Sequence, residues 1–291
     1  MEFKQIFENN INEYADYIDS DVAENIRRLQ YRGIAGHDPE NNKLLSLLIW
    51  RLESVDGSLA TDSELQWLYT ADPAYISQLL NSYHDDSRLN GVRKTSFEST
   101  DMEAEKEAAL IDCGFTIKQV ESRDIDVTID ECNDLSIAQK DAPRYIQSIE
   151  LLANHDFNQG LMNILFRYDD ISQEDIAYLP KDWYEQSVSC YTKTDGKVTG
   201  LLLVHACPSG ILLPVLFYAV GADFKQNLIG MLRFSIRKAA ATYPGNTVIR
   251  IHRRNDNVKA LSAKFFPEKK GAPAIAGERM ENIKTDEKQK H

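Results

Sequence analysis

Residues 196–221 read GKVTGLLLVHACPSGILLPVLFYAVG, and this mostly apolar segment sets the architecture of the chain. Its apolar part is long enough to cross a bilayer, but His205, the turn at 208–210 and Pro214 divide it into two runs of strand length. The segment therefore predicts two buried neighbouring strands and no membrane-spanning helix. Just before it, the dipeptide Asp195-Gly196 is typical of a tight β-hairpin.

The same order of elements occurs twice in the sequence. Downstream of the apolar segment, the spacing predicts a helix, a strand at 248–251 and a helix that ends at Phe265. A weaker copy consists of strands at 44–52 and 65–69, a turn at 55–57, a helix from 73, a strand at 92–97 and a helix at 102–112. Trp67 and Phe217 stand as far apart as Phe115 and Phe265 (217 − 67 and 265 − 115 both equal 150). This duplication predicts two domains of one fold.

The predicted fold class is α/β, of the α+β type, with two tandem domains that each contain a mixed twisted sheet flanked by helices. We expect the first domain at 1–135, the second at 136–270 and a charged tail at 271–291. Alternating apolar and polar residues predict strands at 116–120 and 125–129, which would close the first sheet. Helices are predicted ahead of the two sheets at 11–17, 22–29, 143–153, 158–166 and from 172.

The composition argues against several classes of function. A formal net charge of −12 disfavours broad binding of nucleic acid or anionic membranes, because both need clustered Lys and Arg. The four cysteines have neither CxxC spacing nor a nearby set of histidines, so we expect reduced thiols and no metal site. The N-terminal residues show no basic segment followed by an apolar one, which favours a cytoplasmic protein.

Several features together resemble the GNAT N-acetyltransferase superfamily, present twice. They are the Asp-Gly hairpin, the strand that leads into a helix, and the later run Asn257-Val-Lys-Ala260. In that family a loop of the form R/Q-x-x-G-x-G/A follows the fourth strand, and its backbone N–H groups bind the diphosphate of acetyl-CoA at a helix N-terminus. Residues 225–230, Lys-Gln-Asn-Leu-Ile-Gly, stand at that place. The resemblance covers roughly residues 13–267 and implies an acetyl-CoA site in the second domain.

Leu228 departs from the family motif, because it stands where the central glycine is expected. A side chain there would crowd the anion unless the loop is wider or Leu228 turns into the core. In the first domain the corresponding place is residues 70–78, which contains no glycine and sets Asp72 against an incoming phosphate. We therefore expect no CoA in the first domain.

The resemblance also implies a set of cofactor contacts in the second domain. The strand edge before the loop would pair with the pantetheine amides, and the Asn of the N-x-x-A run would hold the cofactor arm. The alternative for residues 219–221 is that they simply end a buried strand. The candidate cofactor-binding residues are Ala219, Val220, Gly221, Lys225, Gln226, Asn227, Leu228, Ile229, Gly230 and Asn257.

Acetyl transfer to an amine needs a group that takes up the amine proton. His205 and His252, each at the end of a predicted strand, are the nearest titratable candidates, with a half-exposed structural histidine as the alternative for each. Lys264 stands four residues after Ala260, where many family members have a Tyr that protonates the leaving thiolate; the alternative is an ordinary surface lysine. These three residues are the catalytic candidates.

Basic residues gather near the proposed cofactor arm, although the chain as a whole is acidic. They are Arg250, His252, Arg253, Arg254, Lys259 and Lys264. The cluster is a candidate for binding the phosphates of CoA, and its alternatives are a solvated helix start or an Arg250 paired with a neighbouring acid. Acidic residues between 101 and 156 would attract a cationic amine.

Two functions remain open from the sequence. The first is an acyl-CoA-dependent N-acetyltransferase that uses acetyl-CoA and acts on a small-molecule or peptide amine, with no nucleic acid and no membrane as partner. The second is a non-catalytic binding or interaction protein that kept the GNAT scaffold and lost CoA chemistry. Leu228 and the absence of an acid in 212–218 favour the second, whereas the basic cluster, Gly230 and Asn257 favour the first.

Overall fold

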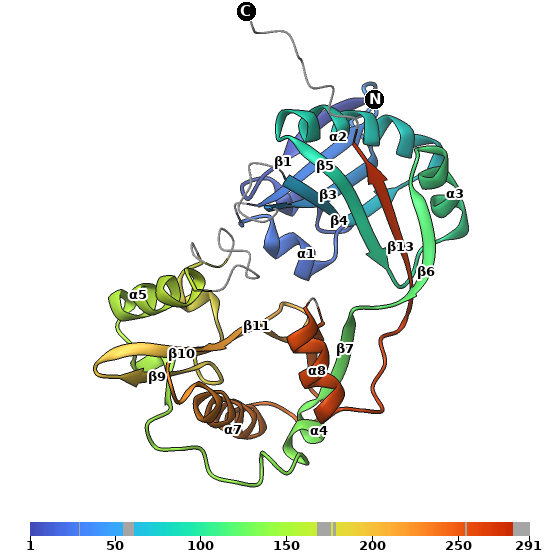
Figure 1. Ribbon diagram of the computed structural model, residues 1–291. Coiled ribbons are helices and arrows are strands. Elements are labelled where there is room, and N and C mark those ends of the chain that lie inside the picture. The colour runs from blue at the N-terminus through green and yellow to red at the C-terminus, as the bar shows by residue number, and fades with distance from the viewer. Residues whose placement is uncertain (29, 55–60, 168–175, 177–178, 254, 282–291) are drawn as a thin grey trace, which may run out of the picture. The chain divides into compact units, whose positions relative to one another are not determined.

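The computed structural model describes residues 1–28, 30–54, 61–167, 176, 179–253 and 255–281, and it divides the chain into two compact units (Figure 1). The first unit comprises Met1–Ser122 and Pro273–His291, and the second unit comprises Arg123–Ala272. Each unit contains one sheet with both parallel and antiparallel strands and with helices packed against it. The predicted fold class is confirmed.

Within the described residues, the sheet of the first unit has seven strands in the order β1-β2-β3-β4-β5-β13-β6. The strands are β1 (Glu2–Ile6), β2 (Tyr31–His37), β3 (Leu44–Ser54), β4 (Thr61–Thr70), β5 (Val92–Ser99), β6 (Thr116–Glu121) and β13 (Pro273–Met280). The helices are η1 (Ile11–Tyr14), α1 (Ser20–Asn25), η2 (Pro73–Tyr75), α2 (Ile76–Leu89) and α3 (Ala104–Asp112). β4 and β5 run parallel, and the other neighbours run antiparallel.

The continuous apolar run of β3 is explained by burial on both faces of the sheet. Leu48 and Trp50 pack into a cluster with α2, whereas Leu47 and Ile49 pack into a second cluster with η1 and α1. All four side chains are fully buried. A strand that is covered on both sides needs apolar residues at every position, because successive side chains point to opposite faces.

In the part of the second unit that the structure describes, the sheet has six strands in the order β7-β12-β11-β10-β9-β8. The strands are β7 (Asp124–Thr128), β8 (Gln147–Ser148), β9 (Cys190–Thr194), β10 (Lys197–Ala206), β11 (Leu212–Ala219) and β12 (Val248–His252). The helices are α4 (Ile129–Asn133), η3 (Ile149–Leu151), α5 (Asn154–Leu165), η4 (Lys181–Trp183), α7 (Phe224–Thr242) and α8 (Asp256–Phe265). Only β11 and β12 are parallel among these described strands.

The apolar segment at 196–221 forms the hairpin β10–β11, as predicted. Leu201 and Leu203 pack into the cluster that contains α5, whereas Leu202 and Val204 pack into the cluster that contains α7. The turn before it also matches, because Asp195 and Gly196 both have positive φ (50° and 77°). No helix in the described part of the chain is long and apolar enough to span a bilayer.

The duplication is confirmed by the topology of the two units. Each contains an antiparallel strand pair, a helix, a strand parallel to the one before the helix, and a second helix: β3-β4-α2-β5-α3 in the first and β10-β11-α7-β12-α8 in the second. In both units the strand before the first helix contains a register shift, which skips Gln66 in β4 and Val215 in β11. The predicted turn at 55–57 lies outside the described residues.

Two strands, β7 and β13, belong to a unit to which the prediction did not assign them, which corrects the predicted domain bounds. β7 was expected to close the first sheet but pairs with β12 of the second unit, from Val248–Thr128 to His252–Asp124. β13 falls in the expected tail but lies between β5 and β6 of the first unit. The chain thus passes from the first unit to the second after Ser122, ahead of the predicted boundary at 135, and returns at Pro273.

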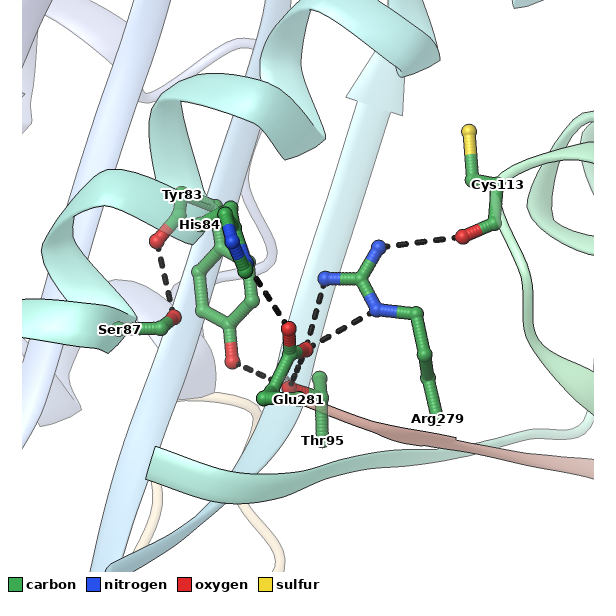
Figure 2. A network of polar contacts seen from close by, with 7 residues as sticks. All are labelled: Tyr83, His84, Ser87, Thr95, Cys113, Arg279 and Glu281. Carbon is green, nitrogen blue, oxygen red and sulfur yellow. Dashed lines mark hydrogen bonds and ion pairs between the residues drawn. The ribbon is translucent and has the colours of Figure 1, made fainter. Parts of the chain in front are cut away.

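A polar network fixes the end of β13 in the first unit (Figure 2). The Glu281 carboxylate accepts hydrogen bonds from Thr95 Oγ1 (2.5 Å) and from Arg279 Nε (3.0 Å) and Nη2 (2.7 Å), and its other oxygen contacts His84 Nδ1 (2.9 Å). Tyr83 donates to Thr95 Oγ1 (2.7 Å). The Glu281 side chain is only 5% exposed. The C-terminal strand therefore ends in a buried ion pair held by α2 and β5.

Some predicted helices differ from the structure. Residues 143–153 contain β8 and η3 instead of the predicted α-helix. Ile146 and Ile149 pack into different clusters, whereas in an α-helix residues three apart would lie on the same face. The helices expected at 11–17 and 22–29 are the shorter η1 and α1, and the one at 158–166 is α5. The helix expected from 172 lies almost wholly outside the described residues.

Candidate functional site

β11 leads into α7 through a short loop at residues 220–223. Gly221 in this loop has a φ of +95°, a conformation that favours glycine, and a Cβ at this position would meet no atom within 4 Å. The Val220 N–H donates to the Thr199 carbonyl (2.7 Å), so β10 anchors the start of the loop. The backbone at Gly221 is therefore fixed on one side and open on the other.

The start of α7 is suited to bind an anion. Its N-cap residue, Asp223, makes no side-chain capping hydrogen bond. The Asn227 N–H donates to the Asp223 carbonyl (3.0 Å) and closes the first turn of the helix. For the N–H groups of Lys225 and Gln226, the residue four positions earlier lies outside the helix, so the helix itself supplies no acceptor. These donors and the helix dipole favour negative charge. Residues 221–226 are exposed, so a ligand in solution reaches them.

β11 and β12 separate soon after they meet. Within the described residues 212–252, the two strands share one pair of partner residues, Leu212 and Ile249, although β11 continues to Ala219. The register shift at Val215 bends β11 where the pairing ends. The ladder between these two strands thus stops well before the α7 loop.

The equivalent place in the first unit is arranged differently. β4 and β5 form five parallel pairs, from Thr61–Val92 to Leu65–Phe97. At the following helix start, Asp72 Oδ1 accepts the Ala74 N–H (2.9 Å), and Pro73 has no N–H to offer. A phosphate at this position would meet a carboxylate that already caps the helix.

The residues predicted to form a phosphate-binding loop are helical. Residues 225–230 lie inside α7, which begins at Phe224, and the loop ahead of them contains Gly221. Lys225 and Gln226 are exposed in the first turn, and Lys225 Nζ lies 5.8 Å from the centre of the Phe224 ring. The prediction of a loop at residues 225–230 is therefore wrong, whereas a role of this run in phosphate binding stays a prediction.

The remaining residues of that run belong mainly to the packing of α7. Leu228 packs against the core cluster of the second unit, and Asn227 is buried with 5% exposure. A Cβ at Gly230 would lie 3.2 Å from Ile146 and from Pro143, so this glycine allows close packing of α7. Ile229 is 41% exposed. The crowding expected from Leu228 is absent, because its side chain turns into the core.

The start of α8 differs in detail from the predicted N-x-x-A contact. The N-cap residue is Asn255, whose side chain accepts the Val258 N–H (2.9 Å). Asn257 and Ala260 are exposed in the first turns of α8, and Lys264 is exposed in its last turn. The role predicted for Asn257 in holding a cofactor stays a prediction.

His205 lies far from the α7 loop. It stands opposite Leu213 on β11, six residues before Ala219, which corresponds to about 20 Å along a strand. Its ring stacks on Trp183 with centroids 3.6 Å apart, and its Nδ1 contacts the Trp183 carbonyl (2.8 Å). His205 is 5% exposed. These contacts match the structural alternative for this residue.

His252 lies at the carboxyl end of β12. β11 and β12 are parallel, so their carboxyl ends, at Ala219 and His252, point the same way. His252 Nδ1 contacts the Asp124 carboxylate of β7, and both side chains are about one-third exposed. The structure thus gives this histidine a carboxylate partner that sequence reasoning missed.

The predicted basic cluster is largely paired with acids. Arg250 makes two hydrogen bonds to the Asp126 carboxylate (2.9 and 2.8 Å), which is the alternative left open by the sequence. Arg253 donates to the Arg123 carbonyl (3.1 Å), and Lys259 lies 3.5 Å from Asp256. Arg254 lies outside the described residues. Three of the six residues, Arg250, His252 and Lys259, thus have an acid as partner.

Two of the four cysteines, Cys132 and Cys190, are buried thiols, and none of the four forms a disulfide. Among the described residues, no group of three or more His, Cys, Asp or Glu side chains is placed to hold a metal ion. Burial raises the pKa of Cys132 to about 12 and raises the pKa of Cys190 further. Thiols of this kind stay protonated and inert near neutral pH.

Comparison with known proteins identifies the fold. No protein-family model and no curated protein matches the sequence. Among solved structures, the chain is similar to a tandem GNAT protein from the clavulanic acid biosynthesis pathway, with a TM-score of 0.61 and 9% identity over 97% of this chain and 98% of that one.

Two further structures cover nearly the whole chain. N-myristoyltransferase of Saccharomyces cerevisiae with bound myristoyl-CoA has a TM-score of 0.56 and 12% identity, over 96% of this chain and 78% of that one. A protein of Enterococcus faecalis V583 described as a "Probable N-Acyltransferase" has a TM-score of 0.52 and 9% identity, over 97% and 73%. The chain therefore has the fold of the GNAT N-acetyltransferase superfamily, present in two tandem domains.

Proposed function

We propose that the protein is an acyl-CoA-dependent N-acyltransferase whose second unit binds the cofactor at the start of α7 and whose acceptor is a small-molecule or peptide amine. In this proposal the cofactor diphosphate lies against the backbone of Gly221 and the first-turn N–H groups of Lys225 and Gln226. The extended part of the cofactor follows Ala219 and Val220, where β11 has left β12.

The proposal is carried by the contrast between the two copies of one arrangement. In the first unit Asp72 caps the helix and β4 stays paired with β5 over five residue pairs. In the second unit Asp223 does not cap α7, Gly221 is open, and β11 leaves β12 after one pair within residues 212–252. A helix start without a capping carboxylate and an early end of the strand pairing occur together in the second copy, which supports binding of a diphosphate with an amide-containing arm.

The chain's own groups suit the charge of such a ligand. An acyl-CoA supplies an acyl group activated as a thioester. The Lys225 ammonium is exposed beside the helix start and adds positive charge to the dipole of α7. Asp223 acts against it, because its exposed carboxylate stands at the same helix start. The balance predicts moderate affinity that weakens with added salt.

The similar structures support an acyl-CoA cofactor without fixing the acyl group. The tandem GNAT protein is described "without AcCoA", and the yeast enzyme was solved with myristoyl-CoA. We propose acetyl-CoA as the first cofactor to test, with longer acyl chains next.

Calorimetric titration with acetyl-CoA tests the proposal directly. We expect saturable binding, and at a hundred times the dissociation constant the ligand should stabilise the native protein by about 2.7 kcal/mol. Gly221→Ala should weaken binding at least tenfold, because alanine strains the loop at φ +95° and moves the backbone that faces the ligand.

Gly210→Ala is the matched control for this variant. Gly210 also has a positive φ (85°), and a Cβ there would likewise meet no atom within 4 Å, but it lies in the turn between β10 and β11, at the other end of those strands. Both variants should lose similar stability, and only Gly221→Ala should lose affinity. Absence of binding at millimolar acetyl-CoA in the wild-type protein would favour a GNAT-like interaction protein that has lost CoA chemistry.

A further inference from the structure

The pairing of β7 with β12 places two acid–base pairs side by side on the second sheet. His252 faces Asp124, and Arg250 faces Asp126, on one face of neighbouring antiparallel strands. Ile249 and Ile251 occupy the opposite face and pack into the core clusters. The alternation of β12 thus keeps His252 and Arg250 away from the core that those isoleucines fill.

Of these two pairs, that of His252 lies nearer to the carboxyl ends of β11 and β12. Ile249 is level with Leu212, so His252, three residues further on, is level with Val215, where β11 bends away. Arg250 stands two residues further back along β12. Ligands of open α/β sheets bind outside the carboxyl ends of strands, at places where neighbouring strands diverge. His252 is therefore the titratable side chain of β12 nearest to the opening.

We propose that His252 is the general base of the second unit and that Asp124 is its positioning residue. The inference rests on the proposed function. The contact of Asp124 with Nδ1 holds the proton on that nitrogen, so that Nε2 carries the lone pair. The partly exposed ring presents Nε2 to an amine that approaches the thioester.

The step is balanced in atoms and electrons. The amine nitrogen attacks the thioester carbonyl carbon, the C–N bond forms, and Nε2 of His252 takes up the proton that the nitrogen loses. The C–S bond breaks, and the CoA thiolate leaves and is reprotonated from the imidazolium or from water. Asp124 stabilises the imidazolium while it carries the proton.

The assignment also gives a role to the pairing of β7 with the second sheet. β7 follows the first unit directly in sequence, yet Asp124 on this strand completes the proton-accepting pair of the second unit. In the described part of these two strands and their flanks, the charged groups around His252 are Asp124, Asp126, Arg123, Arg250 and Arg253.

The test uses the full chain, acetyl-CoA and CoA, and ¹³C,¹⁵N-labelled histidine. The chain has six histidines, so the ring resonance missing in His252→Gln identifies His252. We expect this resonance to differ between the acetyl-CoA and CoA complexes, because the acetyl group lies beside the ring, while the resonance of His205 stays the same in both. Asp124→Asn should transfer at least a third of the neutral ring to the other tautomer, seen in its ¹⁵N shifts.

Slow hydrolysis of bound acetyl-CoA, with water in place of the amine, supplies the rate. His252→Gln should lower this rate at least a hundredfold, the usual lower range for a general base, with an unchanged dissociation constant in calorimetry. Asp126→Asn is the matched control, since it breaks the neighbouring pair on the same strand, and it should alter neither the tautomer nor the rate.

The outcomes separate the two proposals. Absence of acetyl-CoA binding to the wild-type protein removes the proposed function and this inference with it. Normal binding with a His252 resonance that is the same in both complexes, or with hydrolysis as fast in His252→Gln as in the wild type, overturns the inference and leaves the cofactor site intact. An Asp126→Asn variant that behaves like Asp124→Asn would make both pairs structural.

Discussion

The substitution Glu281→Gln should destabilise the first unit by about 3 kcal/mol. Glu281 and Arg279 are 5% and 15% exposed, and loss of one partner from a buried ion pair costs about 3–5 kcal/mol because the other charge stays buried. Glutamine keeps an oxygen that accepts from Thr95, which places the loss at the low end of that range. His84 is 41% exposed, so its pairing adds little.

Urea denaturation followed by tryptophan fluorescence measures this loss. Trp50 and Trp67 lie in the first unit and Trp183 in the second, so a Trp183→Phe background reports on the first unit. With a slope of about 2 kcal/mol per molar urea, the midpoint should fall by about 1.5 M. Trp50 is fully buried and gives the main signal.

Glu278→Gln is the matched control, because Glu278 lies on the same strand and is exposed. It should leave the midpoint within about 0.2 M, since isolated surface charges contribute little. Equal midpoints for Glu281→Gln and Glu278→Gln would refute the reasoning that the buried pair fixes β13 in the sheet.

Three further predictions concern the α7 start, its core contact and acid stability. Asp223→Asn should tighten acetyl-CoA binding about threefold to fivefold at low salt, since an exposed charge about 4 Å from a phosphate contributes about 1 kcal/mol. As a control, Asp195→Asn on the distant hairpin should leave the affinity measured by calorimetry unchanged. Leu228→Gly should leave that affinity no tighter and lower the free energy of unfolding by about 2 kcal/mol, because a helical residue that packs against the core is lost; tighter binding would show that Leu228 does crowd the loop. Burial lowers the pKa of His37, and so, to a smaller extent, does the charge of Lys4; the folded state therefore favours the neutral imidazole. The contribution of neutral His37 to the free energy of unfolding is complete above about pH 6.5 and decreases as the pH falls below that value. The urea midpoint of wild type should thus fall more between pH 7 and pH 5 than that of His37→Gln, and parallel curves would contradict this.

The local patterns of the sequence were sufficient for the elements that are buried on both faces. The continuous apolar runs of β3 and β10 and the Asp195-Gly196 turn are properties of neighbouring residues, and the structure contains all three as predicted. The repeated order of elements was visible for the same reason, because each copy keeps its own strand and helix periods.

Partners distant in sequence could not be predicted in this way. The short run 273–280 contains Ala, Gly and charged residues, and nothing in it specifies a place between β5 and β6, more than 150 residues earlier. β7 likewise alternates as an edge strand of either sheet would. Long-range pairing depends on which strands still have unpaired backbone groups, and only the assembled fold decides that.

The helix that carries the candidate site was predicted in its region, whereas its first turn was not. The helix that follows β11 was located correctly, but its first residue depends on the positive φ of Gly221, which a motif aligned on Gly230 does not reveal. His252 was a candidate on position alone, whereas its partner Asp124 needed the pairing of β7 with β12. An Asp-x-Asp run on an alternating strand is the sequence signal that, in retrospect, marks charged residues on one face.

The place of β13 reverses the order in which the chain can mature during synthesis. Domains commonly fold as they leave the ribosome, the N-terminal one first. Here the first 122 residues emerge without the strand that must separate β5 from β6, while residues 123–272 already contain every strand of their own sheet. The half made second is thus the half that can finish first, and the sheet of the earlier half stays incomplete until residues 273–280 have been made.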